Sequence, residues 1–114
     1  VSFRENGLAP IKMESDGKWG FIDRTGKIIV EPQFDDIGFE GNGLTPVKIG
    51  EKWGYMDDTG HLRISPQFDS ASYFNESGLA PVMFGDYEHR KWGYIDTTGK
   101  IVVEPQFEDA DYFI

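Results

Sequence analysis

The sequence predicts an all-β fold of three tandem repeats of about 35 residues, each a three-stranded β-hairpin unit. Three observations predict it: a hexapeptide occurs three times, a Thr-Gly turn signal follows each copy, and 14 glycines mark frequent turns. A short repeat cannot bury its apolar face alone, so neighbouring units should pack together. We expect them either to stack as an open solenoid-like sheet or to arrange around an axis, as in a propeller or trefoil.

The repeated hexapeptide begins with Lys-Trp-Gly and ends with Asp. Its tryptophans, Trp19, Trp53 and Trp92, are separated by 34 and then 39 residues. Each copy continues through the turn signal to Pro-Gln-Phe, and a Gly-Leu-Ala/Thr-Pro segment precedes each copy. Such dense self-similarity indicates one repeat domain.

These residues resemble the WG-repeat, or KWG-repeat, family. The resemblance covers nearly the whole chain, and KWGYIDTTGKIVVEPQF at residues 91–107 matches the family's signature closely. Known members are mostly bacterial and occur in tandem arrays. The resemblance therefore implies a β-rich repeat rather than a particular reaction.

The domain is expected to span residues 1–114, with repeats at about 3–38, 39–73 and 74–112. Phe113 aligns with Phe3, Phe39 and Phe74, so the last residues re-enter the start of a fourth unit. We therefore expect the chain to be an excerpt of a longer array. Open sheet edges in such an array would permit self-association.

Each unit is predicted to contain three strands. The first strands are expected at residues 8–13, 44–49 and 79–84, the second begin at Lys-Trp-Gly, and the third are expected at 27–31, 61–65 and 100–104. Between the second and third strands, an Asp begins each turn and a Gly supplies the positive φ. The proline after each third strand lacks an N–H, so it should end the ladder or mark an edge of the sheet.

Alternation along the strands predicts which side chains face the core. Arg63 must meet water, so its neighbours on the third strand should point inward. The expected core of the third strands is Leu62 and Ile64, Ile28 and Val30, and Ile101 and Val103. The expected core of the first strands is Ile11 and Met13, Val47 and Ile49, and Val82 and Phe84.

The Trp-Gly pairs are predicted to be structural. Aromatic residues that repeat in register more often form the packing unit between neighbours than a ligand platform. Each glycine should leave room for a close neighbour, from the next repeat's backbone or a ring. The residues concerned are Trp19 and Gly20, Trp53 and Gly54, and Trp92 and Gly93.

Composition argues against several functions. The net charge of −9 disfavours nucleic acid and anionic membranes, although it suits a basic partner or a cation. No stretch approaches the length of a membrane-spanning helix, so membrane insertion is not expected. With no cysteine and two histidines, a metal site is not expected either, and no cofactor is predicted.

Acidic residues offer two candidate chemistries, each with a structural alternative. The recurrent Asp23, Asp57 and Asp96 could bind calcium, but turn initiation is the favoured role. Further acids follow each Pro-Gln-Phe, and paired carboxylates could serve a glycosidase, but a solvated acidic rim is favoured. These acids are Asp35, Asp36, Asp69, Glu108, Asp109 and Asp111. No catalytic residue is predicted.

Residues that break the repeat are the better binding candidates. An insertion before the third Lys-Trp-Gly carries an aromatic ring, both charge signs and an imidazole, and insertions in repeat arrays map to loops that often bind. The candidates are Asp86, Tyr87, Glu88, His89 and Arg90 in the insertion, together with Arg63.

The sequence thus predicts a non-catalytic scaffold that binds a protein or a cell-surface polymer, at an extracellular or cell-surface location. The alternative is a carbohydrate-binding or carbohydrate-active domain that uses exposed aromatics and acids. A third possibility is a spacer with no ligand of its own.

Overall fold

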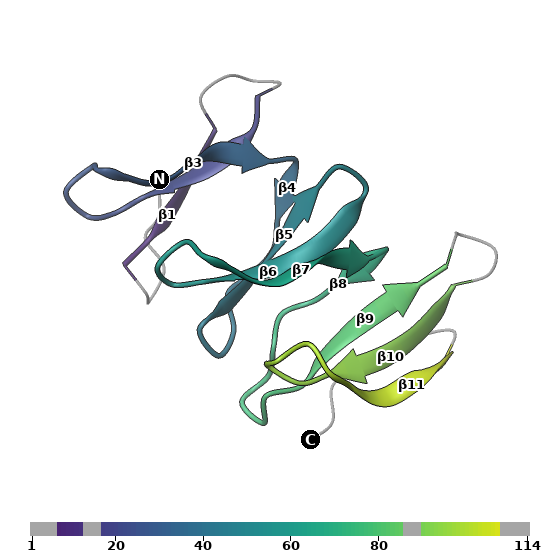
Figure 1. Ribbon diagram of the computed structural model, residues 1–114. Coiled ribbons are helices and arrows are strands. Elements are labelled where there is room, and N and C mark those ends of the chain that lie inside the picture. Colours follow the sequence, from purple (N-terminus) through teal and green to yellow (C-terminus); the bar gives the residue numbers. More distant parts are fainter. Residues whose placement is uncertain (1–6, 13–16, 86–89, 108–114) are drawn as a thin grey trace.

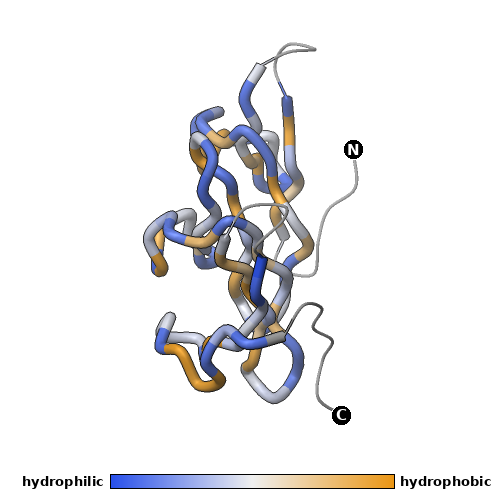
Figure 2. Tube along the Cα trace, turned by 90° about the vertical axis from the view of Figure 1, so that its right-hand side faces the viewer, coloured by the Kyte–Doolittle hydropathy of each residue, from blue (hydrophilic) through white to orange (hydrophobic). Residues whose placement is uncertain are grey.

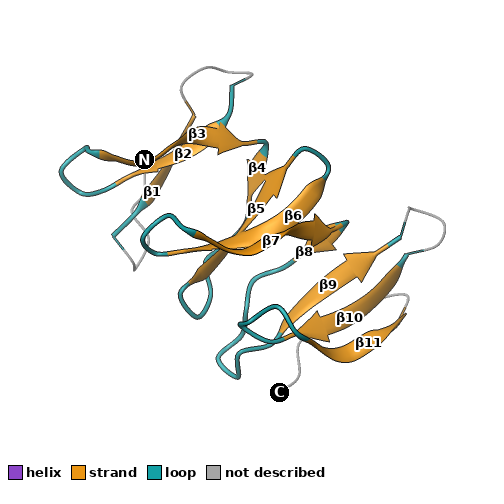
Figure 3. Cartoon of the chain, in the orientation of Figure 1, coloured by secondary structure: helices purple, strands orange, loops and turns teal. Residues whose placement is uncertain are grey.

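The computed structural model describes residues 7–12, 17–85 and 90–107, and these residues form strands, turns and loops without a helix (Figures 1 and 3). The all-β prediction with three tandem units is confirmed. The first sheet contains β1 (Ala9–Lys12), β2 (Trp19–Ile22) and β3 (Ile28–Phe34). The second contains β4 (Asp36–Ile37), β5 (Leu44–Ile49), β6 (Lys52–Asp57) and β7 (Leu62–Phe68). The third contains β8 (Ser70–Ala71), β9 (Ala80–Phe84), β10 (Lys91–Ile95) and β11 (Ile101–Phe107).

One short strand follows the first sheet and another follows the second, and each joins the edge of the next sheet. After β3, the chain adds β4 to the edge of the second sheet, where Asp36 pairs with Lys48 of β5. After β7, it adds β8 to the third sheet in the same way, with Ser70 opposite Met83. The ends of the first two units therefore cover the open edge of the unit that follows. The prediction of three strands per unit did not include these short strands.

The third strands run past their prolines, so the predicted ends at residues 31, 65 and 104 are wrong. In the second sheet, Trp53 lies opposite Phe68 while Tyr55 lies opposite Ile64, so β7 contains extra residues at a register shift. Pro66 lies within that irregular stretch. A bulge removes the proline from the regular ladder, and pairing resumes beyond it.

The glycine of each Trp-Gly pair faces this bulge. A Cβ built on Gly54 would lie 2.4 Å from the carbonyl oxygen of Ile64 and 2.8 Å from the nitrogen of Pro66. Gly20 and Gly93 meet the equivalent atoms of their own third strands. The close neighbour is therefore the same unit's backbone, not the next repeat's backbone or a ring.

The hydrophobic core lies between consecutive sheets. Phe21, Val30 and Phe34 of the first sheet form one cluster with Val47 and Met56 of the second sheet. Trp19 packs against this cluster, partly buried.

A second cluster joins the second and third sheets. It combines Tyr55 and Phe68 with Val82 and Ile95, and Trp53 packs against it. Tyr55 and the adjacent Met56 are both fully buried because the middle sheet is covered on its two faces.

Several predicted core residues are instead exposed. Val30 and Ile64 are buried as expected, but Ile28, Leu62 and Ile101 are 39%, 44% and 38% exposed. A further register shift, between Tyr55 and Met56 in the second sheet, interrupts the alternation on which the prediction relied.

The predicted core residues of the first strands also need correction. Val47 and Val82 are buried as predicted, and Phe84 packs partly buried against the second cluster. Ile49 is exposed at the strand end, Ile11 is half-buried, and Met13 lies outside the described residues. Residues Leu44 to Val47 are all buried, because the beginning of β5 is covered on both faces.

The three sheets form a row from the N-terminal to the C-terminal unit (Figure 1), with overall extents of 43 × 29 × 20 Å. A view turned by 90° shows apolar and polar positions interspersed along the strands (Figure 2). The described strands do not close into a barrel. In the same residues, no helix is long and apolar enough to span a bilayer.

Candidate functional site

The predicted binding segment can be placed only in part. Asp86, Tyr87, Glu88 and His89 lie outside the described residues, and Arg90 is exposed just before β10.

Arg63 lies elsewhere, in β7, where its Nε donates a hydrogen bond to Oδ2 of Asp57 at 2.6 Å. It borders a polar hollow that also includes Asn42 and the turn residues Thr97 and Thr98. Arg63 is therefore held by the turn of its own unit.

The recurrent aspartates form turns, as predicted. Oδ1 of Asp23 accepts hydrogen bonds from the backbone nitrogens of Thr25, at 2.8 Å, and Lys27, at 3.1 Å, and from the Thr25 hydroxyl. The Thr25 hydroxyl holds the pKa of Asp23 below its usual value, and Thr98 does the same for Asp96.

Asp57 forms the corresponding turn in the second unit. Desolvation raises its pKa, but hydrogen bonds from Thr59 and Arg63 outweigh this effect and hold the pKa well below its usual value. The described residues contain no group of three or more His, Asp or Glu side chains arranged to hold a metal ion.

Two of the acids after Pro-Gln-Phe, Asp35 and Asp69, keep contact with solvent, as the acidic-rim prediction expects, and they also join neighbouring units. Asp69 is ion-paired with Lys52 of its own unit, and its Oδ2 accepts a hydrogen bond from the backbone nitrogen of Gly85 at 2.8 Å. Asp35 makes the same contacts with Lys18 and Gly50. The lysine lowers the pKa of each aspartate. We call each set an aspartate clamp.

An exposed aromatic pair lies between the second and third units. Phe39, between β4 and β5, is 76% exposed, and Tyr73, between β8 and β9, is 41% exposed. Their ring centroids are 6.4 Å apart and the ring planes meet at 88°, an edge-to-face contact. Equivalent connections of consecutive units thus bring two large rings together at the surface.

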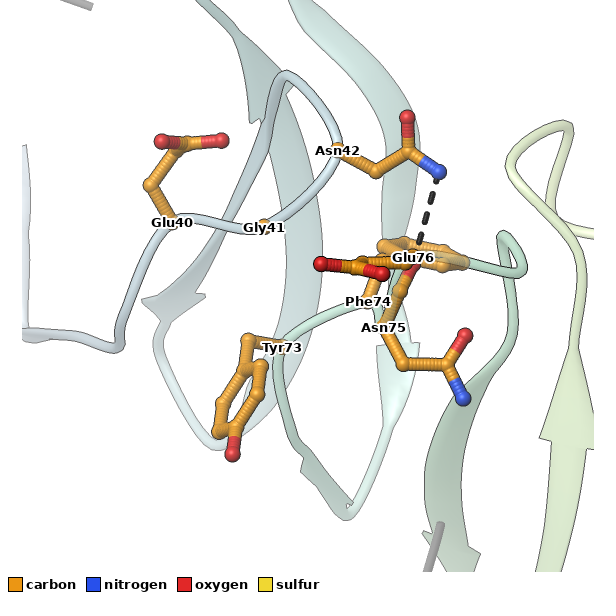
Figure 4. A pocket seen from close by; sticks show the side chains of 7 residues that line it. All are labelled: Glu40, Gly41, Asn42, Tyr73, Phe74, Asn75 and Glu76. Atoms are coloured by element: carbon orange, nitrogen blue, oxygen red, sulfur yellow. Dashed lines mark hydrogen bonds between the residues drawn. The ribbon is translucent and has the colours of Figure 1, made fainter. Parts of the chain in front are cut away.

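Tyr73 of this pair also lines a hollow of about 560 Å³, whose lining residues are shown in Figure 4. It is lined by Glu40, Gly41, Asn42, Tyr73, Phe74, Asn75 and Glu76. A Cβ on Gly41 would lie 2.1 Å from the carbonyl oxygen of Phe74, so the two connections touch at this glycine. Asn42 Nδ2 donates to the carbonyl oxygen of Asn75 at 3.4 Å, across the same joint. We call these lining residues, together with Phe39, the joint surface.

Several polar groups of the joint surface are already used by the fold. Glu40 Oε2 accepts a hydrogen bond from the Gly43 nitrogen at 2.9 Å, and Asn75 Oδ1 accepts one from the Leu79 nitrogen at 3.1 Å. Asn42 adopts a positive φ of 54° in the turn that places it. Glu76 is exposed, and no described residue forms a hydrogen bond or ion pair with its carboxylate.

The joint surface was not predicted from the sequence. The expected alignment pairs Phe39 with Phe74, but Phe74 is 2% exposed and lies in the core. Tyr73 is the structural counterpart of Phe39, because each follows the phenylalanine of its Pro-Gln-Phe by the same number of residues. Counting from Pro-Gln-Phe would have revealed this match.

In a comparison with known protein families, residues 19–53, 53–87 and 92–114 match the family described as WG containing repeat. Searches of curated proteins and of solved structures found no match. Three matches correspond to the three predicted copies, and each begins at a tryptophan, Trp19, Trp53 or Trp92, not at the predicted start of a repeat. Together the matches cover most of the chain. The chain therefore belongs to the family of proteins with WG-containing repeats.

Proposed function

We propose that this chain is a non-catalytic repeat scaffold that displays a binding surface to a partner protein. The observation that carries the proposal is the edge-to-face pair of Phe39 and Tyr73 beside the hollow of the joint surface. Leaving large rings in water is unfavourable, and exposed aromatic residues in or beside a concave surface are typical of interaction sites.

The contacts of the residues that recur in each repeat support a scaffold and not an enzyme. The aromatic residues of the units fill the clusters between sheets, and the repeated aspartates bind turn amides or clamp neighbouring units. Their pKa values are lowered, whereas a general acid needs a raised one. The exposed rings of Phe39 and Tyr73 and the side chains around the adjoining hollow remain for recognition.

A carbohydrate ligand is the second candidate. The hollow combines the Tyr73 ring with the amides of Asn42 and Asn75 and the carboxylate of Glu76, all within one open surface. Hydroxyl groups of a sugar could hydrogen-bond to such amides and carboxylates while a ring covers an apolar face. In this case too, the chain would bind its ligand without catalysing a reaction.

The test is site-specific cross-linking followed by a binding measurement. A photoreactive amino acid is placed at Phe39, or at Glu51 as an exposed control, in the protein expressed in its native cells. The expected result is a protein captured at position 39 only, which as a purified partner binds the chain saturably. Replacement of both Phe39 and Tyr73 by Ser should abolish that binding without lowering the Tm.

Equal capture at both positions, or a captured protein whose purified form binds the double variant as tightly, would refute the proposal. Saturable binding of a sugar polymer alone, lost in the double variant, would favour the second candidate.

A further inference from the structure

We infer that the joint surface receives a cationic side chain, arginine or lysine, presented by a basic segment of the partner. This inference rests on the proposed function and specifies the chemistry of its ligand. Three features of the surface support it: its charge, its rings and the hydrogen-bond acceptors that it offers.

Charge complementarity is the first feature. The lining includes the carboxylates of Glu40 and Glu76 and contains no lysine, arginine or histidine. The whole chain carries a formal charge of −9, so the field around it attracts basic partners and accelerates their encounter. An acidic partner would be repelled by both the local and the overall charge.

The rings are the second feature. Tyr73 lines the hollow, and the exposed Phe39 ring packs edge-to-face against the Tyr73 ring at an interplanar angle of 88°. The faces of aromatic rings attract cations, arginine most often. At an exposed site each such contact strengthens binding by roughly two- to five-fold.

The third feature is the balance of acceptors and donors. Asn42 Nδ2 is used by the carbonyl oxygen of Asn75, so Asn42 offers its remaining oxygen, and Glu76 offers both carboxylate oxygens. A guanidinium group has five N–H donors and no acceptor, which suits such a lining. A sugar hydroxyl is neutral, so it could bond to the Asn75 amide nitrogen as well as to these oxygens but would leave the negative charge of the lining uncompensated.

The experiment is an NMR titration of the whole 114-residue chain with three probes. The first is the capped peptide Gly-Arg-Gly-Arg-Gly, and the second is the same peptide with citrulline for arginine, which keeps the shape and removes the charge. The third is a neutral glucose oligomer. Backbone amide shifts report the site, and their saturation gives each Kd.

The arginine peptide is expected to cause saturable shifts confined to residues 39–43 and 73–76. The citrulline peptide should bind at least ~5-fold more weakly, because it lacks the cation. Replacing both Phe39 and Tyr73 by Ser should weaken arginine-peptide binding by about 5- to 20-fold, and Glu76→Gln by about 3-fold.

Glu51→Gln is the matched control. It removes one exposed carboxylate from the opposite end of the β5–β6 hairpin, so it changes the net charge as Glu76→Gln does while leaving the joint surface intact. Its Kd for the arginine peptide should equal that of the parent chain. Unchanged Tm values confirm that all variants are folded.

Three outcomes would overturn the inference. The first is equal binding of the arginine and citrulline peptides. The second is shifts spread over the acidic surface with equal losses in Glu51→Gln and Glu76→Gln, which would show non-specific attraction. The third is saturable shifts with the glucose oligomer alone. None of these outcomes refutes the proposed function, because the test of that function is the capture of a partner protein at position 39.

Discussion

Glycine follows each tryptophan because of backbone contact inside a single unit. Gly54 has no room for a side chain, since its Cβ position lies 2.4 Å from the Ile64 carbonyl oxygen. Gly26, in a turn, has a different requirement: its φ is 86° and no atom lies within 4 Å of its Cβ position. One glycine is required by packing and the other by backbone conformation.

Gly54→Ala is therefore expected to lower the free energy of unfolding by about 2–4 kcal/mol, because β7 must move away from β6. Gly26→Ala, the control, should lower it by only ~1 kcal/mol, the strain of a left-handed alanine. Urea denaturation measures both. Equal losses in the two variants would contradict the steric role of Gly54.

The turn aspartates predict how stability depends on pH. Hydrogen bonds from Thr25, Thr59 and Thr98 hold the pKa values of Asp23, Asp57 and Asp96 below the ordinary value, so in acid the unfolded chain binds more protons than the folded chain. Their stabilisation is fully present above about pH 5 and is lost as the pH falls through about 4 and below.

The Tm should thus be level between pH 7 and 5 and fall steeply toward pH 3. Asp57→Asn keeps an acceptor oxygen in the turn but cannot be protonated, so its Tm should be lower at pH 7 and decline less in acid. Asn75 already forms such a turn. An acid decline as steep in Asp57→Asn as in the parent would show that Asp57 does not contribute to it.

At the scale of the strands, the aspartate clamps connect consecutive sheets. Asp69 follows β7, and its contacts with Lys52 and Gly85 connect the Trp-Gly strand of one unit to the first hairpin of the next. The backbone nitrogen of Asp69 also donates to the Met83 carbonyl oxygen at 2.9 Å. The clamp therefore begins β8 and aligns it with β9.

Asp69→Ala should lower the free energy of unfolding by about 1–2 kcal/mol, because the Gly85 nitrogen loses its acceptor and the lysine pairing is lost. Asp69→Asn should recover part of this loss, since the amide oxygen can still accept from Gly85. Chemical denaturation provides the comparison. A loss no greater in Asp69→Ala than in Asp36→Ala, an exposed acid in β4 that belongs to neither clamp, would exclude a clamp role.

At the scale of the whole molecule, the sheets share their cores: in the described part of the chain, each hydrophobic cluster joins two consecutive sheets. The second sheet buries Met56 against the first sheet and Tyr55 against the third. Removal of both neighbours would expose two apolar faces of a small sheet, which is too little structure to be stable alone.

A fragment of residues 36–68, which contains the second sheet, is therefore expected to be unfolded, with neither strand circular dichroism nor a cooperative thermal transition. The complete chain should unfold cooperatively through its shared clusters. Cooperative melting of the fragment would contradict the placement of the core between units.

The sequence by itself determined the β class, the three units, the turns and the family resemblance. These properties rest on local chemistry: Asp and Gly form the same turn wherever they occur, and the repeat spacing is visible without coordinates. The burial of Val30, Ile64, Val47 and Val82 also followed from alternation.

Only the tertiary structure decided the rest. The bulges that carry the third strands past their prolines depend on pairing with β2, β6 and β10, and they expose Leu62 and its equivalents. The joint surface depends on how two units meet, since Phe39 and Tyr73 are far apart in sequence and adjacent only across that joint. A repeat predicts its own internal turns, but contacts between units arise from packing, which no single unit encodes.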